Sequence, residues 1–95
     1  RIQMHKDLCK ILNETYESKN SDYGNSFGET FSKLGIVSAV TRISDKYNRL
    51  CSLATKSDEE RKVKDESITD TLLDMANYCI MTVIEMQIEK MNKEQ

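Results

Sequence analysis

Apolar residues recur along this 95-residue chain at the three- and four-residue spacing of α-helices. The first such segment runs from about Ile2 to Ser18. Its apolar side chains form one stripe, which comprises Met4, Leu8, Ile11, Leu12 and Tyr16. The stretch from Lys19 to Gly28 is rich in turn-forming residues and is expected to end this helix. Residues 29–34 can then form one short helical turn before Gly35 interrupts it.

A second long helix is predicted from about Ile36 to Ala54. Its apolar stripe consists of Ile36, Ala39, Val40, Ile43, Tyr47, Leu50 and Ala54. The polar residues 56–64 follow. Within them, Ser57 and Glu60 have the spacing of a helix-capping box, so a third helix can begin there. Alternatively, residues 56–64 form a mobile connector and the third helix begins near Asp65. In both cases the third helix is expected to run to about Met91.

The third helix is expected to be buried from several directions, because it carries two apolar stripes. One stripe comprises Ile68, Leu72, Met75, Cys79 and Val83, and the other comprises Leu73, Ile80, Ile84 and Ile88. In so short a chain this requires a central helix or a subunit interface, and we expect both. The predicted fold is a single all-α domain over residues 1–95: an antiparallel bundle of three main helices plus a short one, completed by homodimerisation.

Composition agrees with a helical protein and excludes several classes of function. The chain has no proline, three glycines and 32% charged residues. Its net charge of -2 lacks the basic character of nucleic-acid binding, so we expect no nucleic-acid partner. No run of about 18 apolar residues is present, which argues against a membrane partner. We expect a cytoplasmic protein.

The cysteines indicate neither a disulfide framework nor a zinc site. Cys9, Cys51 and Cys79 are odd in number, widely spaced and surrounded by apolar residues, which predicts buried, reduced thiols. The single histidine, His5, has no paired cysteine motif beside it, so no structural zinc is expected.

An acidic stripe on the third helix is the first candidate for chemistry. Glu66, Asp70, Asp74 and Asn77 fall within roughly 80° of arc on a helix. Like charges four residues apart destabilise a helix by about 0.2–0.5 kcal/mol per pair, so their stacking needs a cause. Either solvation or a bound cation supplies one. Asn77 lies inside an apolar run and is expected either to face a ligand or to form a hydrogen bond in the core.

The second helix has its own charged face, made of Arg42, Asp45, Lys46 and Arg49. Antiparallel packing of the second and third helices would set this face beside the acidic stripe. Carboxylates for a hard cation, next to cations for phosphate oxygens, suit a nucleotide–magnesium complex. The alternative is that the two arginines form interhelical salt bridges with the neighbouring aspartates.

The expected loop before residue 28 combines a turn with aromatic and amide side chains. Tyr23 or Phe27 can stack on a base while Asn25 or Ser26 binds its edge or a phosphate. Alternatively, both aromatic rings cap the bundle core. Lys19 and Asn20, at the expected end of the first helix, can bind a ligand or satisfy the free carbonyl groups of the helix. No nucleophile motif and no glycine-rich phosphate loop is present.

Three segments together resemble the nucleotide-modification-associated domain family of phages, prophages and some bacteria. They are residues 19–27 (KNSDYGNSF), 42–50 (RISDKYNRL) and 65–78 (DESITDTLLDMANY). The resemblance implies a small helical domain linked to handling nucleotides during phage growth, and hence the host cytoplasm if the chain is phage-encoded.

The chain is more distantly similar to the all-α MazG-like and dimeric dUTPase pyrophosphohydrolases. Those enzymes bind magnesium through an E-x-x-E pair on one helix and an E-x-x-D pair on the next. Glu14 and Glu17 match the first pair. The acidic helix departs from the second pair, because its carboxylates are spaced four residues apart, and Asp45 stands where the family has a glutamate.

Three functions follow as hypotheses. The first is a magnesium-dependent (deoxy)nucleoside triphosphate pyrophosphohydrolase with Glu66 and Asp70 as catalytic residues. Its magnesium ligands would be Asp45, Glu66, Asp70 and Asp74. Its substrate-binding residues would be Lys19, Asn20, Asp22, Tyr23, Asn25, Phe27, Arg42, Lys46, Arg49 and Asn77. The second is a non-catalytic nucleotide-binding module, either a sensor or a sponge that sequesters a signal nucleotide. The third is a helical protein-interaction domain whose acidic stripe is solvated.

Overall fold

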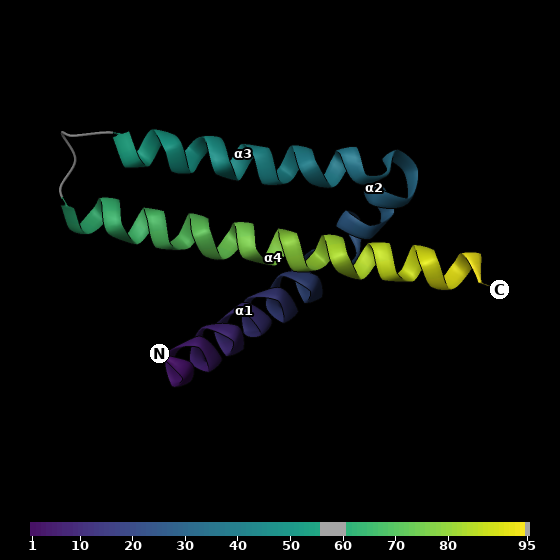
Figure 1. Cartoon of the computed structure of the whole chain (residues 1–95), viewed down its shortest axis with the longest axis horizontal. Helices are drawn as coiled ribbons and strands as arrows, with labels where there is room; N and C mark the ends of the chain where they lie inside the picture. Colours follow the sequence, from purple (N-terminus) through teal and green to yellow (C-terminus); the bar gives the residue numbers. More distant parts are fainter. Residues whose placement is uncertain (56–60, 95) are drawn as a thin grey trace.

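The computed structural model describes residues 1–55 and 61–94, which form helices and no strand (Figure 1). The elements are α1 (Ile2–Tyr23), α2 (Ser26–Leu34), α3 (Ile36–Thr55) and α4 (Arg61–Lys93). The predicted all-α class is therefore confirmed. No helix in the described part of the chain has the length and apolar character needed to cross a membrane.

The long helices α3 and α4 lie side by side and run in opposite directions (Figure 1). Small side chains at their buried positions favour close approach: Ala39 on α3, and Thr71 and Thr82 on α4. Each threonine hydroxyl donates a hydrogen bond of 2.7 Å to the backbone carbonyl four residues earlier. Because these hydroxyls are satisfied within their own helix, their burial leaves no unpaired polar group.

Glycines set the two sharp turns that precede α3. Gly24 ends α1 with φ 67°, and Gly35 ends α2 with φ 76°, a region that a residue with a Cβ rarely adopts. Each glycine amide donates to the carbonyl four residues earlier, Asn20 and Phe31 respectively. Between them, the nine-residue α2 reverses the chain and buries Phe31.

The boundaries of α1 and α2 differ from the sequence prediction. Lys19–Tyr23 continue α1, and α2 begins at Ser26, so the expected loop over residues 19–28 shrinks to Gly24 and Asn25. Polar residues such as Asn20 and Ser21 are tolerated in an exposed last turn, and the helix ends at Gly24, which takes a positive φ.

The ends of α3 and α4 lie close to those predicted. Helix α3 ends at Thr55, one residue beyond Ala54, and α4 ends at Lys93, two residues beyond Met91. Asp65, the alternative start of the third helix, lies inside α4. The capping-box residues Ser57 and Glu60 are outside the described residues.

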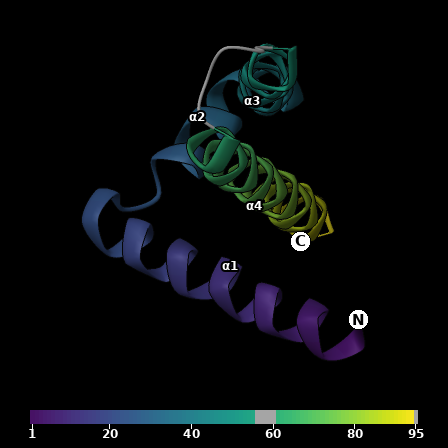
Figure 2. The same ribbon diagram turned by 90° about the vertical axis from the view of Figure 1, so that its left-hand side faces the viewer.

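Helix α1 crosses α4 near its own middle, around Leu12, and diverges from it toward the N-terminus (Figures 1 and 2). It buries none of its residues. Leu12 and Tyr16 are half-buried, whereas Met4, Leu8 and Ile11 of the same apolar stripe are exposed. The described helices thus form an antiparallel α3–α4 pair with α1 splayed from it. All three cysteines are exposed, so the predicted buried thiols are wrong for the single chain.

Candidate functional site

A cavity of about 240 Å³ lies where α1 ends, α2 and α3 begin, and α4 passes beneath them. Its aromatic and apolar lining consists of Tyr16, Tyr23, Phe27, Tyr78, Met81 and Ile84. Its polar lining includes Lys19, Asn20, Asn25, Ser26, Thr30, Ser38, Arg42, Asp74, Asn77 and Glu85. Flat apolar rings beside cations and amides make it the candidate functional site.

Helical spacing explains how distant parts of the sequence reach one cavity. On α1, Tyr16, Lys19, Asn20 and Tyr23 are separated by three or four residues, so they share one face of the last two turns. On α4, a face with the same spacing begins with Asp74 and Asn77 and continues through Tyr78, Met81 and Glu85. The tight turn at Gly24 then directs the start of α2 back over this opening.

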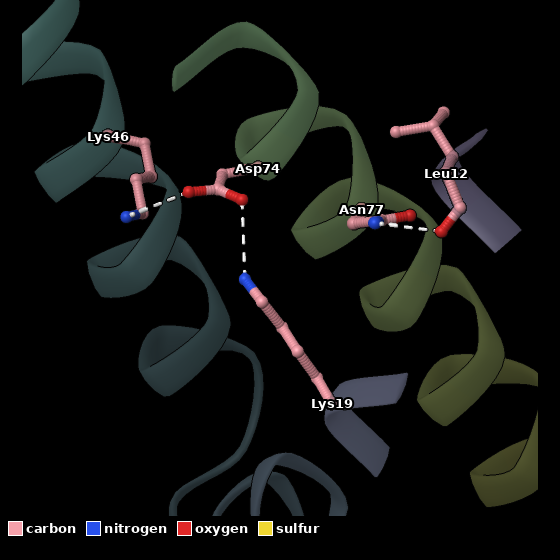
Figure 3. A network of polar contacts seen from close by, with 5 residues as sticks. All are labelled: Leu12, Lys19, Lys46, Asp74 and Asn77. Carbon is pink, nitrogen blue, oxygen red and sulfur yellow. Dashed lines mark hydrogen bonds and ion pairs between the residues drawn. The ribbon is translucent and has the colours of Figure 1, made fainter. Parts of the chain in front are cut away.

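Asp74 joins three helices through its two carboxylate oxygens (Figure 3). The ammonium of Lys19 on α1 lies 3.4 Å from Oδ1, and that of Lys46 on α3 lies 3.4 Å from Oδ2. The Asp74 side chain is one-third exposed, and Lys19 is more exposed than Lys46. Exposed pairs of this kind contribute about 0–1 kcal/mol each, so their main effect is to position the lysines.

Asn77 both lines the cavity and binds α1. Its Nδ2 donates a hydrogen bond of 3.1 Å to the backbone carbonyl of Leu12 (Figure 3). Of the two roles left open by the sequence, the hydrogen bond is therefore formed, and the ligand-facing role stays a prediction. The Oδ1 atom takes no part in this bond.

Phe27 and Tyr78 form an aromatic pair at the cavity, with ring centroids 5.9 Å apart and planes inclined by 40°. Phe27 is half-buried, so it packs against α4 while it lines the site. Tyr23 is 74% exposed at the same opening. The site therefore has one ring fixed by packing against α4 and another free to turn toward a bound group.

Arg42 brings a guanidinium group to the cavity from the first half of α3. Within the described part of the chain it makes no ion pair, and neither does Arg49 two turns later. The arginine salt bridges considered from the sequence are therefore not formed among these residues. Lys46, and not an arginine, makes the contact from α3 to the acidic stripe.

The acidic stripe is divided between two places. Asp74 lines the main cavity, whereas Glu66 and Asp70 line a separate shallow hollow with Asp65 and Thr69. Asp45 lines neither. The described residues contain no group of three or more histidine, cysteine or acidic side chains able to hold a metal ion. Each step of four residues on one helix adds about 6 Å, so a shared face does not bring the carboxylates together.

The structure gathers some of the predicted ligand-binding residues and leaves others outside. Those lining the cavity are Lys19, Asn20, Tyr23, Asn25, Phe27, Arg42, Asp74 and Asn77. Lys46 touches the site through Asp74, and Asp22 and Arg49 lie outside the lining. Ser26, considered with Asn25 for binding a base edge or a phosphate, also lines the cavity. Residues not singled out from the sequence are Tyr16, Thr30, Ser38, Tyr78, Met81, Ile84 and Glu85. Helical spacing from Asn20, Asp74 and Asn77 could have indicated Tyr16, Tyr78 and Met81.

Comparison with known families gives one match. Residues 19–86 match the family model described as nucleotide modification associated domain 1. The matched span begins at Lys19 and includes Glu85, so it contains nearly the whole cavity lining. No curated protein and no solved structure matches the chain. The more distant likeness to MazG-like pyrophosphohydrolases therefore stays a prediction.

Proposed function

This chain belongs to the nucleotide modification associated domain 1 family, and on that premise we propose that its cavity binds a nucleotide. The observation that carries the proposal is the placement of aromatic rings in one small cavity with the guanidinium of Arg42, which makes no ion pair among the described residues. A base needs flat apolar contact, and phosphate oxygens need directional cationic donors. Both kinds of group line the opening between α1, α2 and α4.

The two parts of a nucleotide match different walls of the cavity. Tyr23 and Phe27 offer ring faces on which a base can stack, a contact worth about 1–3 kcal/mol per base. Arg42 offers a planar fork of donors that matches two phosphate oxygens, and Lys19 adds a mobile point charge. The amide of Asn77 or Asn25 can pair with a base edge or a sugar hydroxyl.

The size of the cavity limits the ligand. A volume of about 240 Å³ is below the roughly 300–1,000 Å³ of most ligand pockets. One base and its adjacent phosphate are therefore the expected bound portion, with any further phosphate reaching into solvent beyond Lys19. This favours a mononucleotide over a dinucleotide.

Hydrolysis is the second candidate function, and one observation supports it. Two carboxylates, Asp74 and Glu85, line the same cavity as Lys19 and Arg42. Magnesium is commonly held by one or two carboxylates together with substrate phosphates, so a complete protein cage is not required. When bound in this way, magnesium would neutralise phosphate charge for attack by water. Glu66 and Asp70 would then act away from this cavity, and their catalytic role remains a prediction.

A thermal-shift panel of nucleotides, each with and without magnesium, tests both candidates. A nucleotide at about 100 times its dissociation constant should stabilise the wild-type chain by about 2.7 kcal/mol. Analysis of the products in each mixture that stabilises the chain then distinguishes the two candidate functions. Intact nucleotide indicates binding alone, and released pyrophosphate or phosphate indicates hydrolysis. Stabilisation by inorganic phosphate alone, with none added by any base, would contradict nucleotide recognition.

A matched pair of variants ties the effect to the cavity. Arg42→Gln removes the guanidinium that lines it, and Arg49→Gln removes an equivalent charge from the same helix outside it. We expect Arg42→Gln to abolish the nucleotide-dependent shift and Arg49→Gln to preserve it. Equal loss in both variants would point to general charge attraction rather than to this site.

A further inference from the structure

Helix α4 turns its apolar side chains outward over the stretch from Thr71 to Met86. The exposed positions there are all apolar or cysteine: Leu72, Cys79, Ile80, Val83 and Met86. The two charged residues of the same stretch, Asp74 and Glu85, are partly buried and line the cavity. A helix facing water shows the opposite pattern.

Helix α3 shows the same inversion. Its four charged residues, Arg42, Asp45, Lys46 and Arg49, share one flank, as the sequence analysis found. On the other flank, Ile36, Val40 and Tyr47 are all exposed. Arg42 lies at the cavity and Lys46 contacts Asp74, so the charged flank of α3 is on the cavity side.

The apolar flanks of α3 and α4 lie on the same side of the pair. Val40 follows buried Ala39 by one residue, and Val83 follows buried Thr82 by one residue, a rotation of about 100° away from the buried contact in each helix. Because α3 and α4 are antiparallel, the same rotation from the buried contact, made along each helix in its chain direction, leads to the same side of the helix pair. Figure 2 looks along the pair and shows α2 on one side, with no described helix covering the other and α1 passing below α4.

This surface, termed the apolar face, comprises Val40, Tyr47, Leu72, Cys79, Val83 and Met86. The spacing of its positions indicates what kind of partner covers it. With the half-buried Ala76, the α4 positions at 72, 76, 79, 83 and 86 alternate steps of four and three residues. On α3, positions 36, 40, 43 and 47 do the same. This is the spacing with which one helix packs along another at a shallow angle.

The amount of exposed surface is large enough for a stable interface. The chain exposes 7601 Å², whereas a compact monomer of its mass exposes about 5,600 Å². Its radius of gyration is 15.6 Å, against about 12.4 Å for a compact domain of this length. The excess of about 2,000 Å², to which the divergent α1 also contributes, exceeds the roughly 800 Å² that each partner buries in a standard interface.

The hydrophobic core of the single chain is also small. Phe31, Ala39 and Leu53 are the buried hydrophobic residues of the described part, and no large side chain there is fully buried. We infer that a second copy of this chain covers the apolar face, so that α3 and α4 of both copies form a four-helix core. A two-fold related copy brings the same paired helices, apolar and free of charge, to the same surface. The two cavities then lie on the outer sides of the dimer.

Molar mass in solution tests this inference directly. By light scattering or sedimentation equilibrium, the wild-type chain should have twice its 11.0 kDa mass. Val83→Glu and Val40→Glu place a charge in the apolar face, and each should raise the dimer dissociation constant by at least about thirtyfold. The matched control is Val63→Glu on α4: Val63 is 50% exposed against 52% for Val83, and it lies about 200° away around the helix. It should leave the dimer intact.

Thiol reactivity gives a second readout on the wild-type chain, with no substitution that could affect folding. All three cysteines are exposed in the single chain. Cys79 belongs to the apolar face, Cys51 lies beside Tyr47 at its edge, and Cys9 lies outside it on α1. In the dimer, Cys79 should react with a thiol reagent at least tenfold more slowly than Cys9 on α1, and in Val83→Glu the two rates should converge.

Several results would overturn the inference. They are a wild-type mass of one chain at every concentration, a dimer that survives Val83→Glu and Val40→Glu, or dissociation caused by Val63→Glu. A wild-type monomer whose Cys79 stays fully reactive would leave the apolar face to a different partner protein. None of these measurements uses a nucleotide, so their outcome is separate from that of the proposed function.

Discussion

Lys19 and Asp74 are 55 residues apart in the chain, and their side chains meet at 3.4 Å across the cavity (Figure 3). This contact joins α1 to α4 at the point where α1 contributes to the site. Since α1 has no buried residue, polar contacts such as this one and the Asn77–Leu12 hydrogen bond hold its second half, from Leu12 to Lys19, in place. The α1 wall of the cavity therefore depends on a few polar contacts.

Asp74→Asn should loosen the α1 wall while leaving the α3–α4 pair folded. The substitution removes the carboxylate that positions Lys19 and Lys46, at a cost of about 1 kcal/mol or less, because these pairs are partly exposed. Amide hydrogen exchange over residues 12–23 should accelerate severalfold. The control is Glu89→Gln, which removes the exposed Lys93–Glu89 pair of α4 and should leave exchange in α1 unchanged. Unchanged exchange in Asp74→Asn would contradict this role.

Asn77→Ala should destabilise the chain by about 1 kcal/mol, the usual cost of losing one hydrogen bond to the backbone. Alanine has a higher helix propensity than asparagine, which offsets part of this loss. Asn48→Ala on the exposed surface of α3 measures that gain alone and should be neutral or slightly stabilising. Urea unfolding of both variants isolates the hydrogen bond, and equal stability changes would show that the bond to Leu12 contributes nothing.

Gly28→Ala should move the Asn25 side chain. A Cβ at position 28 would lie 2.5 Å from Asn25 Oδ1 and 2.6 Å from its Nδ2, so this flexible amide must shift. The helix gains about 1 kcal/mol of propensity from the change, so stability should hold or rise. Asn25 lines the cavity, and nucleotide affinity should fall as its amide is displaced. Nuclear magnetic resonance of the Asn25 side-chain amide measures the shift without any ligand, and an unmoved signal would contradict the argument.

Cys51 affects the titration of Tyr47 on α3. A side-chain hydrogen bond with Cys51, together with the charge on its thiolate, raises the pKa of Tyr47 above the ordinary value of 10.0. A raised pKa in the folded state means that the neutral phenol is favoured there. The resulting stabilisation is therefore fully present below pH 10.0 and is lost as pH rises through the raised pKa. Cys51→Ala should lower the Tyr47 pKa toward 10.0, as measured from its ring resonances, and an unchanged titration would exclude this influence.

Much of the candidate site was accessible from local sequence pattern. Asp74 and Asn77 are three residues apart on a strongly periodic helix, so their shared face followed from spacing alone. Arg42 was identified from the charged flank of α3, and Lys19 from its position near the end of α1. The cavity contains all four. Tyr78 was missed although it lies four residues after Asp74. Glu85 was missed because an acidic residue in an apolar helix has no signature until a neighbouring helix meets it.

The sequence by itself determined the helical class, the extent of α3 and the face on which each helix carries its charge. Those properties depend on backbone preference and on the 3.6-residue period, both of which act within one helix. Only the tertiary structure decided that Asp74 pairs with Lys19 and Lys46, and that Glu66 and Asp70 lie in a different hollow. It also decided that α1 diverges from α4. Those outcomes depend on how one helix is rotated about its axis and crosses another, and the periodicity of the sequence does not fix either quantity. An apolar or charged stripe marks one side of its own helix, but it does not identify the neighbouring helix that will face that side.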